Sequence, residues 1–176
     1  MKFINLNYLV IIIYLISSSF SYSIEPPDIK NLIIHKDRKK IENVDFFNFK
    51  GQKISINNYV ENTVMINFWA TWCAPCRKEM PDLDALQSNN KLENLKIFPI
   101  NVGKEKIEKA EKFFLELKIK NLDIYFDDTV KLANLFSLRG IPTSVIINKN
   151  GEEFARIMGA IDFTDKKFVE WLRKYN

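Results

Sequence analysis

Cysteine and histidine are scarce in this sequence, and their scarcity limits the chemistry that the chain can support. The chain of 176 residues has two cysteines, Cys73 and Cys76, and one histidine, His35. A structural zinc site takes about four ligands, so cysteine and histidine alone cannot build a closed one here. His35 lies far upstream of the cysteines, and we expect it to be a solvated linker residue. We expect no resident metal ion and no cofactor.

An excess of charge of one sign is also missing. The chain has 26 lysines and arginines against 22 aspartates and glutamates, a formal net charge of +4. The stretch KEKIEKAEKFFLELK, from Lys104 to Lys118, mixes both signs, as is typical of solvated helix surfaces. The sequence therefore gives no indication of a nucleic-acid partner. Its 47% apolar content is enough for one domain with a filled core, and we expect a monomer.

An apolar run long enough to be a clear membrane span is absent too. Tyr8 to Ile16 is apolar throughout, whereas a bilayer core requires about 20 residues. A charged start before this run and small residues after it are typical of a secretory signal, cleaved after Ser21 or Ser23. The alternative is an uncleaved anchor that includes Phe3 to Phe20. No cysteine lies at the end of this segment, which excludes lipid attachment there.

These features divide the chain into three parts. Residues 1–23 are expected to form the signal peptide or membrane anchor, and residues 24–43 a linker stiffened by Pro26 and Pro27. Residues 44–176 are expected to form the folded domain. We expect this domain to be exported to the periplasm, either free or tethered to the inner membrane.

Strand and helix patterns alternate along the folded domain. Apolar strands flank two turns that contain glycine, and these patterns predict two β-hairpins, around Gly51 and around Asn150-Gly151. Pro99 lies within a predicted strand and indicates a bulge or an edge position. The remaining predicted elements are strands at 63–69, 95–102 and 123–126, and helices at 74–90 (kinked at Pro81), 104–118, 129–136 and from the N-cap Thr164 onward. The succession predicts an α/β fold with a mixed sheet covered on both faces.

The two cysteines are three residues apart in the stretch FWATWCAPCRKEMP, from Phe68 to Pro81. A disulfide between them would close a very short loop, and short loops give little stabilisation. Two thiolates could instead hold Cu(I), which is soft enough to accept them. A copper-binding protein therefore remains an alternative.

A reactive pair has a clearer physical basis. Cys73 lies where a strand ends and a helix begins, so its sulfur would face free backbone N–H groups and the positive end of the helix dipole, which stabilise a thiolate. Cys76 lies almost one helical turn further along the same face, near enough to bond to Cys73. One sulfur can attack and the other can resolve, so the sequence favours thiol–disulfide exchange.

The residues around the pair also resemble a known family. WCAPC after an apolar strand, with GIPT before a later strand, looks like a thioredoxin-fold oxidoreductase. The longer strings FWATWCAPCRKEMPDLDALQ and GIPTSVIINKNGE resemble exported thiol–disulfide proteins of the TlpA/ResA type, TlpA most closely, over about Phe46 to Tyr175. The resemblance implies a thioredoxin fold, whose central mixed sheet is flanked by helices, with an N-terminal β-hairpin and a helix–strand insertion within Lys104 to Phe136.

The resemblance implies roles for individual residues. Cys73 would be the exposed nucleophile and Cys76 the buried resolving thiol of a redox-active disulfide. Pro142 would be a cis-proline facing the pair, which would leave the backbone of Ile141 free to bind an extended partner; the alternative is an ordinary turn proline. Glu79 would tune proton transfer at Cys76, or else be a solvated carboxylate.

Three further positions complete the expected site. Trp69 and Trp72 are interpreted as packing around the pair. Asn67 stands where cytosolic thioredoxins have a buried aspartate, and an amide cannot accept a proton in its place. This departure assigns the proton-acceptor role to Glu79 or to water.

The resemblance finally implies a function. The chain would be an exported reductase acting on proteins with cysteine pairs, either apocytochromes c or copper-site proteins of cytochrome oxidase, with a membrane thiol carrier as its reductant. The opposite, oxidising direction and the copper-binding protein are the alternatives. A peroxidase is disfavoured because no Pro-x-x-x-Thr-x-x-Cys arrangement precedes either cysteine.

Overall fold

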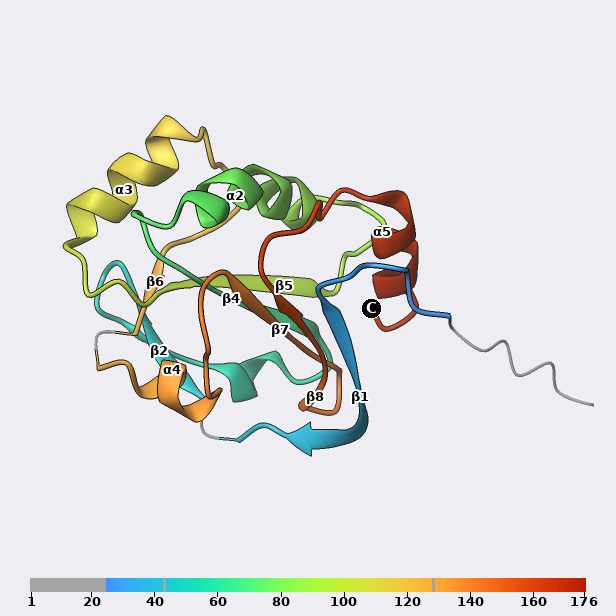
Figure 1. The fold of residues 1–176 in the computed structure, drawn as a ribbon. Helices are drawn as coiled ribbons and strands as arrows, with labels where there is room; N and C mark the ends of the chain where they lie inside the picture. Colours follow the sequence, from blue (N-terminus) through green and yellow to red (C-terminus); the bar gives the residue numbers. More distant parts are fainter. Residues whose placement is uncertain (1–24, 43, 128) are drawn as a thin grey trace, which may run out of the picture.

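The computed structural model describes residues 25–42, 44–127 and 129–176, and an eight-stranded mixed sheet lies at its centre (Figure 1). The strand order is β1-β8-β7-β4-β5-β6-β2-β3. Only the β4–β5 and β5–β6 pairs are parallel among the described strands. The strands are β1 (Leu32–Lys40), β2 (Asp45–Asn48), β3 (Lys53–Ser55), β4 (Thr63–Trp69), β5 (Leu95–Asn101), β6 (Tyr125–Phe126), β7 (Thr143–Ile147) and β8 (Glu152–Met158).

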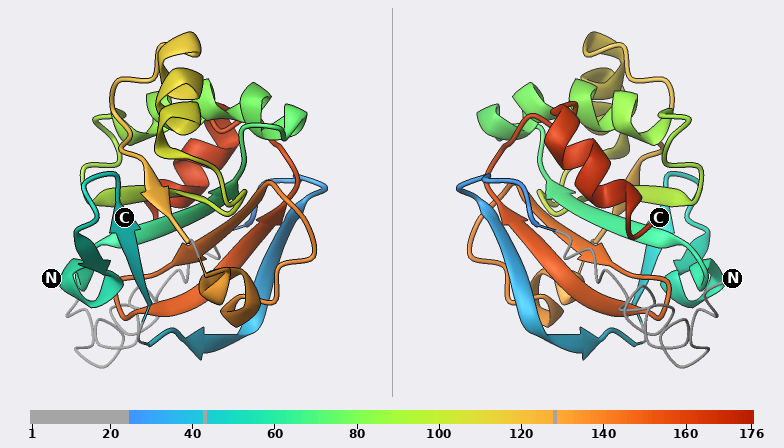
Figure 2. Two further views of the ribbon diagram at one scale, coloured as in Figure 1. Left: turned by 90° about the vertical axis from the view of Figure 1, so that its left-hand side faces the viewer. Right: turned by 90° about the vertical axis from the view of Figure 1, so that its right-hand side faces the viewer.

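Helices cover both faces of this sheet. One face carries α2 (Ala74–Gln87), α3 (Ile107–Glu116) and α5 (Lys166–Arg173), and the other carries α4 (Lys131–Leu135) and the short 3-10 helix η1 (Ile56–Tyr59), as both views in Figure 2 show. The predicted α/β fold with a covered mixed sheet is confirmed. None of the helices in the described ranges has the length and apolarity needed to cross a bilayer. The predicted signal or anchor, residues 1–23, lies outside the described residues.

Strand β4 is buried on both faces, as its apolar sequence TVMINFW predicts. Successive side chains of a strand point to opposite faces. Met65 and Trp69 accordingly join the core under α2, while Ile66 and Phe68 join the core on the α4 side. A strand fixed on both faces gives the residues that follow it a rigid starting point.

Both predicted hairpins are present. β2 pairs with β3, and β7 pairs with β8, each in antiparallel fashion. Gly51 (φ +71°) and Gly151 (φ +75°) occupy the left-handed backbone region at the two turns, which glycine adopts without steric strain. The N-terminal hairpin of the implied fold is therefore confirmed.

The expectation of a linker over residues 24–43 is wrong for Leu32–Lys40. These residues form β1, which pairs antiparallel with β8 at the edge of the sheet. Most of β1 is exposed and highly charged, so its sequence lacks the alternation that predicts a strand. Charged side chains are common on edge strands, where they discourage pairing with other chains.

His35 is not a solvated linker residue either. It lies on β1, and its Nε2 is 3.1 Å from Oε1 of Glu153 on β8. Glu153 is buried and also accepts two hydrogen bonds from Arg156, from Nε (2.7 Å) and from Nη2 (3.0 Å). His35 therefore belongs to a polar cluster that ties β1 to β8.

The structure differs from the predicted elements at Pro81, at Pro99 and at the N-cap of the last helix. The helix α2 runs through Pro81 without a break in its assignment and ends at Gln87, earlier than predicted. Pro99 causes no bulge, because the register of β5 against β4 is unbroken and pairing with β6 begins only at Ile100. The N-cap of α5 is Asp165, whose carboxylate accepts the N–H of Phe168 (3.0 Å), and not Thr164.

Candidate active site

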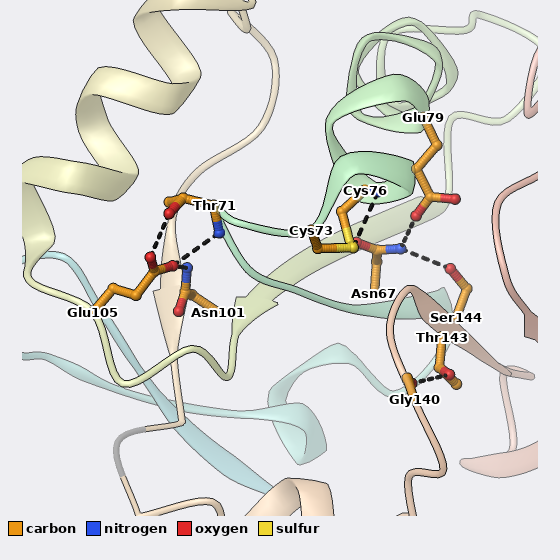
Figure 3. Close-up of a disulfide and its surroundings, with 10 residues drawn as sticks. All are labelled: Asn67, Thr71, Cys73, Cys76, Glu79, Asn101, Glu105, Gly140, Thr143 and Ser144. Atoms are coloured by element: carbon orange, nitrogen blue, oxygen red, sulfur yellow. Dashed lines mark hydrogen bonds between the residues drawn. A yellow bond between two sulfur atoms is a disulfide. The ribbon is translucent and has the colours of Figure 1, made fainter.

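The two cysteines lie at the junction of β4 and α2, where the sequence predicts them. In the turn between these elements, the N–H of Cys73 donates to the carbonyl of Ala70 (3.2 Å). Cys73 is the N-cap residue of α2, and a disulfide joins it to Cys76 (Figure 3). The Cys73 sulfur also accepts a hydrogen bond from the N–H of Cys76 (3.2 Å). The sulfur thus faces the first free backbone amides of the helix.

The expected difference in exposure between the two cysteines is small in this oxidised state. Cys73 is 5% exposed and Cys76 is fully buried. The expectation of an exposed Cys73 is therefore wrong for the disulfide form, because the pair lies within the buried cluster under α2. Of the two cysteines, only Cys73 has any exposed surface.

The two tryptophans before the pair have opposite environments. Trp69 is buried and packs against Phe113 and Phe114 of α3, with ring centroids 4.7 and 5.5 Å away. Trp72, in contrast, is 68% exposed. Its interpretation as packing around the site is wrong, because the turn between β4 and α2 presents its indole to solvent.

The Ile141–Pro142 peptide bond is cis, as the resemblance implies. The loop before β7 that carries it is closed by the Thr143 hydroxyl, which donates to the carbonyl of Gly140 (2.8 Å). Ile141 packs against the buried cluster that contains both cysteines. In the parts of the chain that the structure describes, its backbone N–H and carbonyl make no hydrogen bond. This backbone is available to an extended partner.

Glu79 lies one turn after Cys76 on α2 and is buried, which excludes the solvated alternative. Its Oε1 accepts a hydrogen bond from Nδ2 of Asn67 (2.8 Å), and the same nitrogen donates to the Ser144 hydroxyl (2.9 Å). Asn67 therefore connects α2 to β7 through β4 (Figure 3). Among the described atoms, Glu79 Oε2 and Asn67 Oδ1 are buried without a hydrogen-bond partner.

Burial raises the pKa of Glu79 to about 8, and the hydrogen bond from Asn67 only partly opposes this effect. The charge of Asp82 raises the pKa of Glu79 further. Near neutral pH the Glu79 carboxyl is therefore largely protonated, and it exchanges a proton in the range where thiols also titrate.

Glu105 lies next to the site but is not predictable from the sequence, because its charged surroundings predict a solvated helix surface. Its Oε2 accepts hydrogen bonds from the N–H of Thr71 (2.8 Å) and from Nδ2 of Asn101 (3.1 Å), and its Oε1 accepts one from the Thr71 hydroxyl (Figure 3). Burial raises its pKa, but these hydrogen bonds outweigh burial and hold the pKa below its usual value. The glycine at position 103, two residues after the buried strand β5, is the feature of the sequence that could have indicated it.

No cluster of three or more histidine, cysteine, aspartate or glutamate side chains suited to a metal ion occurs within the described ranges. The site comprises the Cys73–Cys76 disulfide, the buried carboxyl of Glu79 and the free backbone of Ile141.

Comparison with known proteins agrees with this geometry. The sequence profile of the AhpC/TSA family matches residues 38–152. The chain belongs to this family. Its thioredoxin fold places the cysteine pair at the start of α2, as the resemblance implies.

Individual relatives carry names of the same class. The thiol-disulfide oxidoreductase ResA of Geobacillus kaustophilus is 34% identical over 116 residues, which cover 66% of each chain. The thiol-disulfide oxidoreductase ResA of Bacillus cereus is 29% identical over 136 residues, covering 77% of this chain and 76% of the relative. A crystal structure of a putative thiol:disulfide interchange protein DsbE from Chlorobium tepidum superposes with a TM-score of 0.69 at 22% identity, covering 78% of this chain and 96% of the other.

Proposed function

We propose that this chain is an exported thiol:disulfide oxidoreductase that reduces disulfides in other exported proteins. The observation that carries the proposal is the position of Cys73, whose sulfur caps α2 and accepts the N–H of Cys76. Amides and the helix dipole at this position stabilise a thiolate once the pair is reduced. The names of the relatives support the same class of enzyme.

The reaction proceeds in two exchange steps. The Cys73 thiolate attacks one sulfur of a partner disulfide, so that a mixed disulfide forms and the second partner sulfur leaves as a thiolate. Cys76 then loses its proton and attacks the Cys73 sulfur, which releases the partner as a dithiol. Two electrons pass to the partner, whose two sulfurs take up the proton lost by Cys76 and one proton from the solvent, and Cys73 and Cys76 are left as the disulfide seen here.

Glu79 is proposed to serve the second step. Its pKa of about 8 lies close to that of an ordinary thiol, so the ionised fraction of Glu79 accepts the proton of Cys76 with little free-energy change. Asn67, which holds the carboxyl, cannot take this role because an amide does not accept a proton in this range.

The backbone of Ile141 is proposed to bind the partner. An extended segment can pair with its free N–H and carbonyl in the manner of an added strand, next to the sulfur it must reach. The exposed indole of Trp72 offers apolar contact beside the same sulfur. The positions of Ile141 and Trp72 support a role in binding the partner. Neither residue has a reactive side chain.

The compartment and the partners follow from the resemblance. A signal or anchor at residues 1–23 would place the domain in the periplasm, where a membrane thiol carrier would return electrons to the pair. The proposed partners are apocytochromes c or copper-site proteins of cytochrome oxidase, and the chain would act as a monomer. The alternative of a Cu(I) carrier uses the same two thiols and predicts tight Cu(I) binding that is unaffected by changes at Pro142.

The proposal is tested by trapping the mixed disulfide in cells. In the Cys76→Ser variant the second step cannot occur, so Cys73 should accumulate in covalent complexes with a few exported proteins. These complexes should appear on non-reducing gels, disappear on reduction, and be identified by mass spectrometry.

The matched control is the double variant Cys73→Ser, Cys76→Ser, which should trap nothing. Recovery of no disulfide-linked partner from the single variant would count against an exchange enzyme. Partners recovered only with bound copper, and without a disulfide link, would favour the Cu(I) carrier.

A further inference from the structure

Asn101 and Gly103 together determine where the Glu105 carboxylate lies. The N–H of Gly103 donates to Oδ1 of Asn101 (2.8 Å), which turns the amide nitrogen of Asn101 toward Glu105. Gly103 itself leaves the necessary space, because a Cβ at this position would lie 2.7 Å from Oε2 of Glu105. A side chain at position 103 would therefore displace the Glu105 carboxylate from this position.

The residue that Glu105 holds is part of the turn that carries the attacking sulfur. Ala70, Thr71, Trp72 and Cys73 form this turn, which the hydrogen bond from the Cys73 N–H to the Ala70 carbonyl closes. Glu105 binds Thr71 through both its backbone N–H and its hydroxyl. A second link, from the N–H of Val102 to the carbonyl of Trp69 (3.0 Å), joins the same two segments.

We propose that Glu105 is a positioning residue for thiol–disulfide exchange. By fixing Thr71, it holds the turn that keeps the Cys73 sulfur at the start of α2 and presents Trp72 beside it. Glu105 acts through its hydrogen bonds to Thr71 and is not itself a catalytic residue. The proposal rests on Cys73 as the attacking thiol and adds a residue from the predicted insertion to the same site.

The direct test measures the attack of Cys73 alone. In a Cys76→Ser background Cys73 is the only thiol of the chain, and its reaction with a small aromatic disulfide at pH 7 can be followed by stopped-flow absorbance. Replacing Glu105 by Ala leaves the Thr71 N–H without its acceptor, and the rate constant should fall about tenfold, as the loss of hydrogen bonds to a charged group implies. Hydrogen exchange of the Thr71 amide should accelerate at least as much.

Glu105→Gln separates position from charge. A glutamine oxygen can accept from the Thr71 N–H and from Asn101, while its amide donates to the Thr71 hydroxyl oxygen. This variant should therefore keep both the rate and the Thr71 protection within about twofold of the parent, since the geometry survives.

Gly103→Ala perturbs the same contact from the other side without changing Glu105 or the turn. Its Cβ displaces the carboxylate, so the rate should fall as in Glu105→Ala. The two changes should not add when combined, because they remove one contact. Glu108→Ala, an exposed residue in the first turn of α3, is the matched control and should change nothing.

Unchanged attack rates in both Glu105→Ala and Gly103→Ala would overturn the proposal, as would a lower melting temperature without a change in rate. Glu105→Gln as slow as Glu105→Ala would assign the effect to charge and overturn it too. A parent protein whose Cys73 does not react with the disulfide would instead refute the proposed function.

Discussion

Glu79 is a buried carboxyl with one hydrogen-bond donor, and this arrangement makes its proton sensitive to folding. Its pKa rises from 4.5 to about 8, chiefly through burial. Between these values the folded chain holds a proton that the unfolded chain has released. The stability that this group contributes is therefore complete below pH 4.5 and is lost as the pH rises toward about 8.

Replacing Glu79 by Gln should remove this dependence. Glutamine keeps an oxygen for Asn67 but does not titrate, so its free energy of unfolding should change less between pH 5 and pH 8.5 than that of the parent. The difference between the two proteins is at most about 5 kcal/mol. Urea unfolding at both pH values measures it.

Glu108→Gln, an exposed carboxylate of α3, is the control for this comparison and should follow the parent curve. Parallel pH profiles for the parent and Glu79→Gln would contradict the assignment of a raised pKa.

The Glu79→Gln variant should also slow the release of a partner from the mixed disulfide, because Cys76 loses its proposed proton acceptor.

At the scale of elements, α2 holds more than the cysteine pair. Asp84 on this helix accepts three backbone N–H groups of the segment between α3 and β6 through one oxygen, Oδ1: those of Lys120 (3.0 Å), Asn121 (2.6 Å) and Leu122 (3.1 Å). A single carboxylate thus anchors the middle of the predicted insertion to the active-site helix.

Asp84→Ala should lower the free energy of unfolding by about 2 kcal/mol, since three N–H groups lose a charged acceptor. Denaturant unfolding measures the loss, and faster hydrogen exchange confined to residues 120–122 would locate it. Glu111→Ala, an exposed position on α3, should be neutral. A loss of similar size in both variants would contradict an anchor at Asp84.

At the scale of the whole molecule, the edge strand β1 completes the sheet. A chain that begins at Ile41 loses the pairing of β1 with β8 and the His35 contact to Glu153. Its free energy of unfolding should be lower by about 3 kcal/mol or more, because each ladder hydrogen bond is worth about 1 kcal/mol. The exposed β8 edge should also promote association, which light scattering detects.

A chain that begins at Pro26 is the control and should retain the parent stability and remain monodisperse. Equal stability of the two truncated chains would show that β1 contributes nothing to the fold.

The parts of the fold that were predictable are those whose signals are local. The apolar run of β4, the glycines of both hairpins and the cysteine spacing each carry their structure within a few residues. β1 escaped prediction because its pairing with β8 depends on residues more than a hundred positions away. Thr164 and Asp165 are both good caps, and only the final geometry selects Asp165.

Only some residues of the candidate site were predictable from the sequence, as for the fold. The disulfide at the start of α2 and the cis-proline were expected, the latter only from the resemblance and not from any pattern. The hydrogen bonds from Asn67 to Glu79 and to Ser144 bring together three elements, which no spacing rule reveals. Glu105 was hidden in a run of alternating charges whose other members are typical of a solvated surface.

Because Trp72 directly precedes the cysteine pair, tryptophan fluorescence can report the redox state of this protein. Trp69 and Trp171 lie in the core, so their emission stays shielded from solvent, while Trp72 stands in water directly before the sulfur pair. Trp69 shares the buried cluster of both sulfurs, so a change in fluorescence on adding a reductant would come from Trp69 and Trp72, and the redox state of the unlabelled protein can be followed in a cuvette.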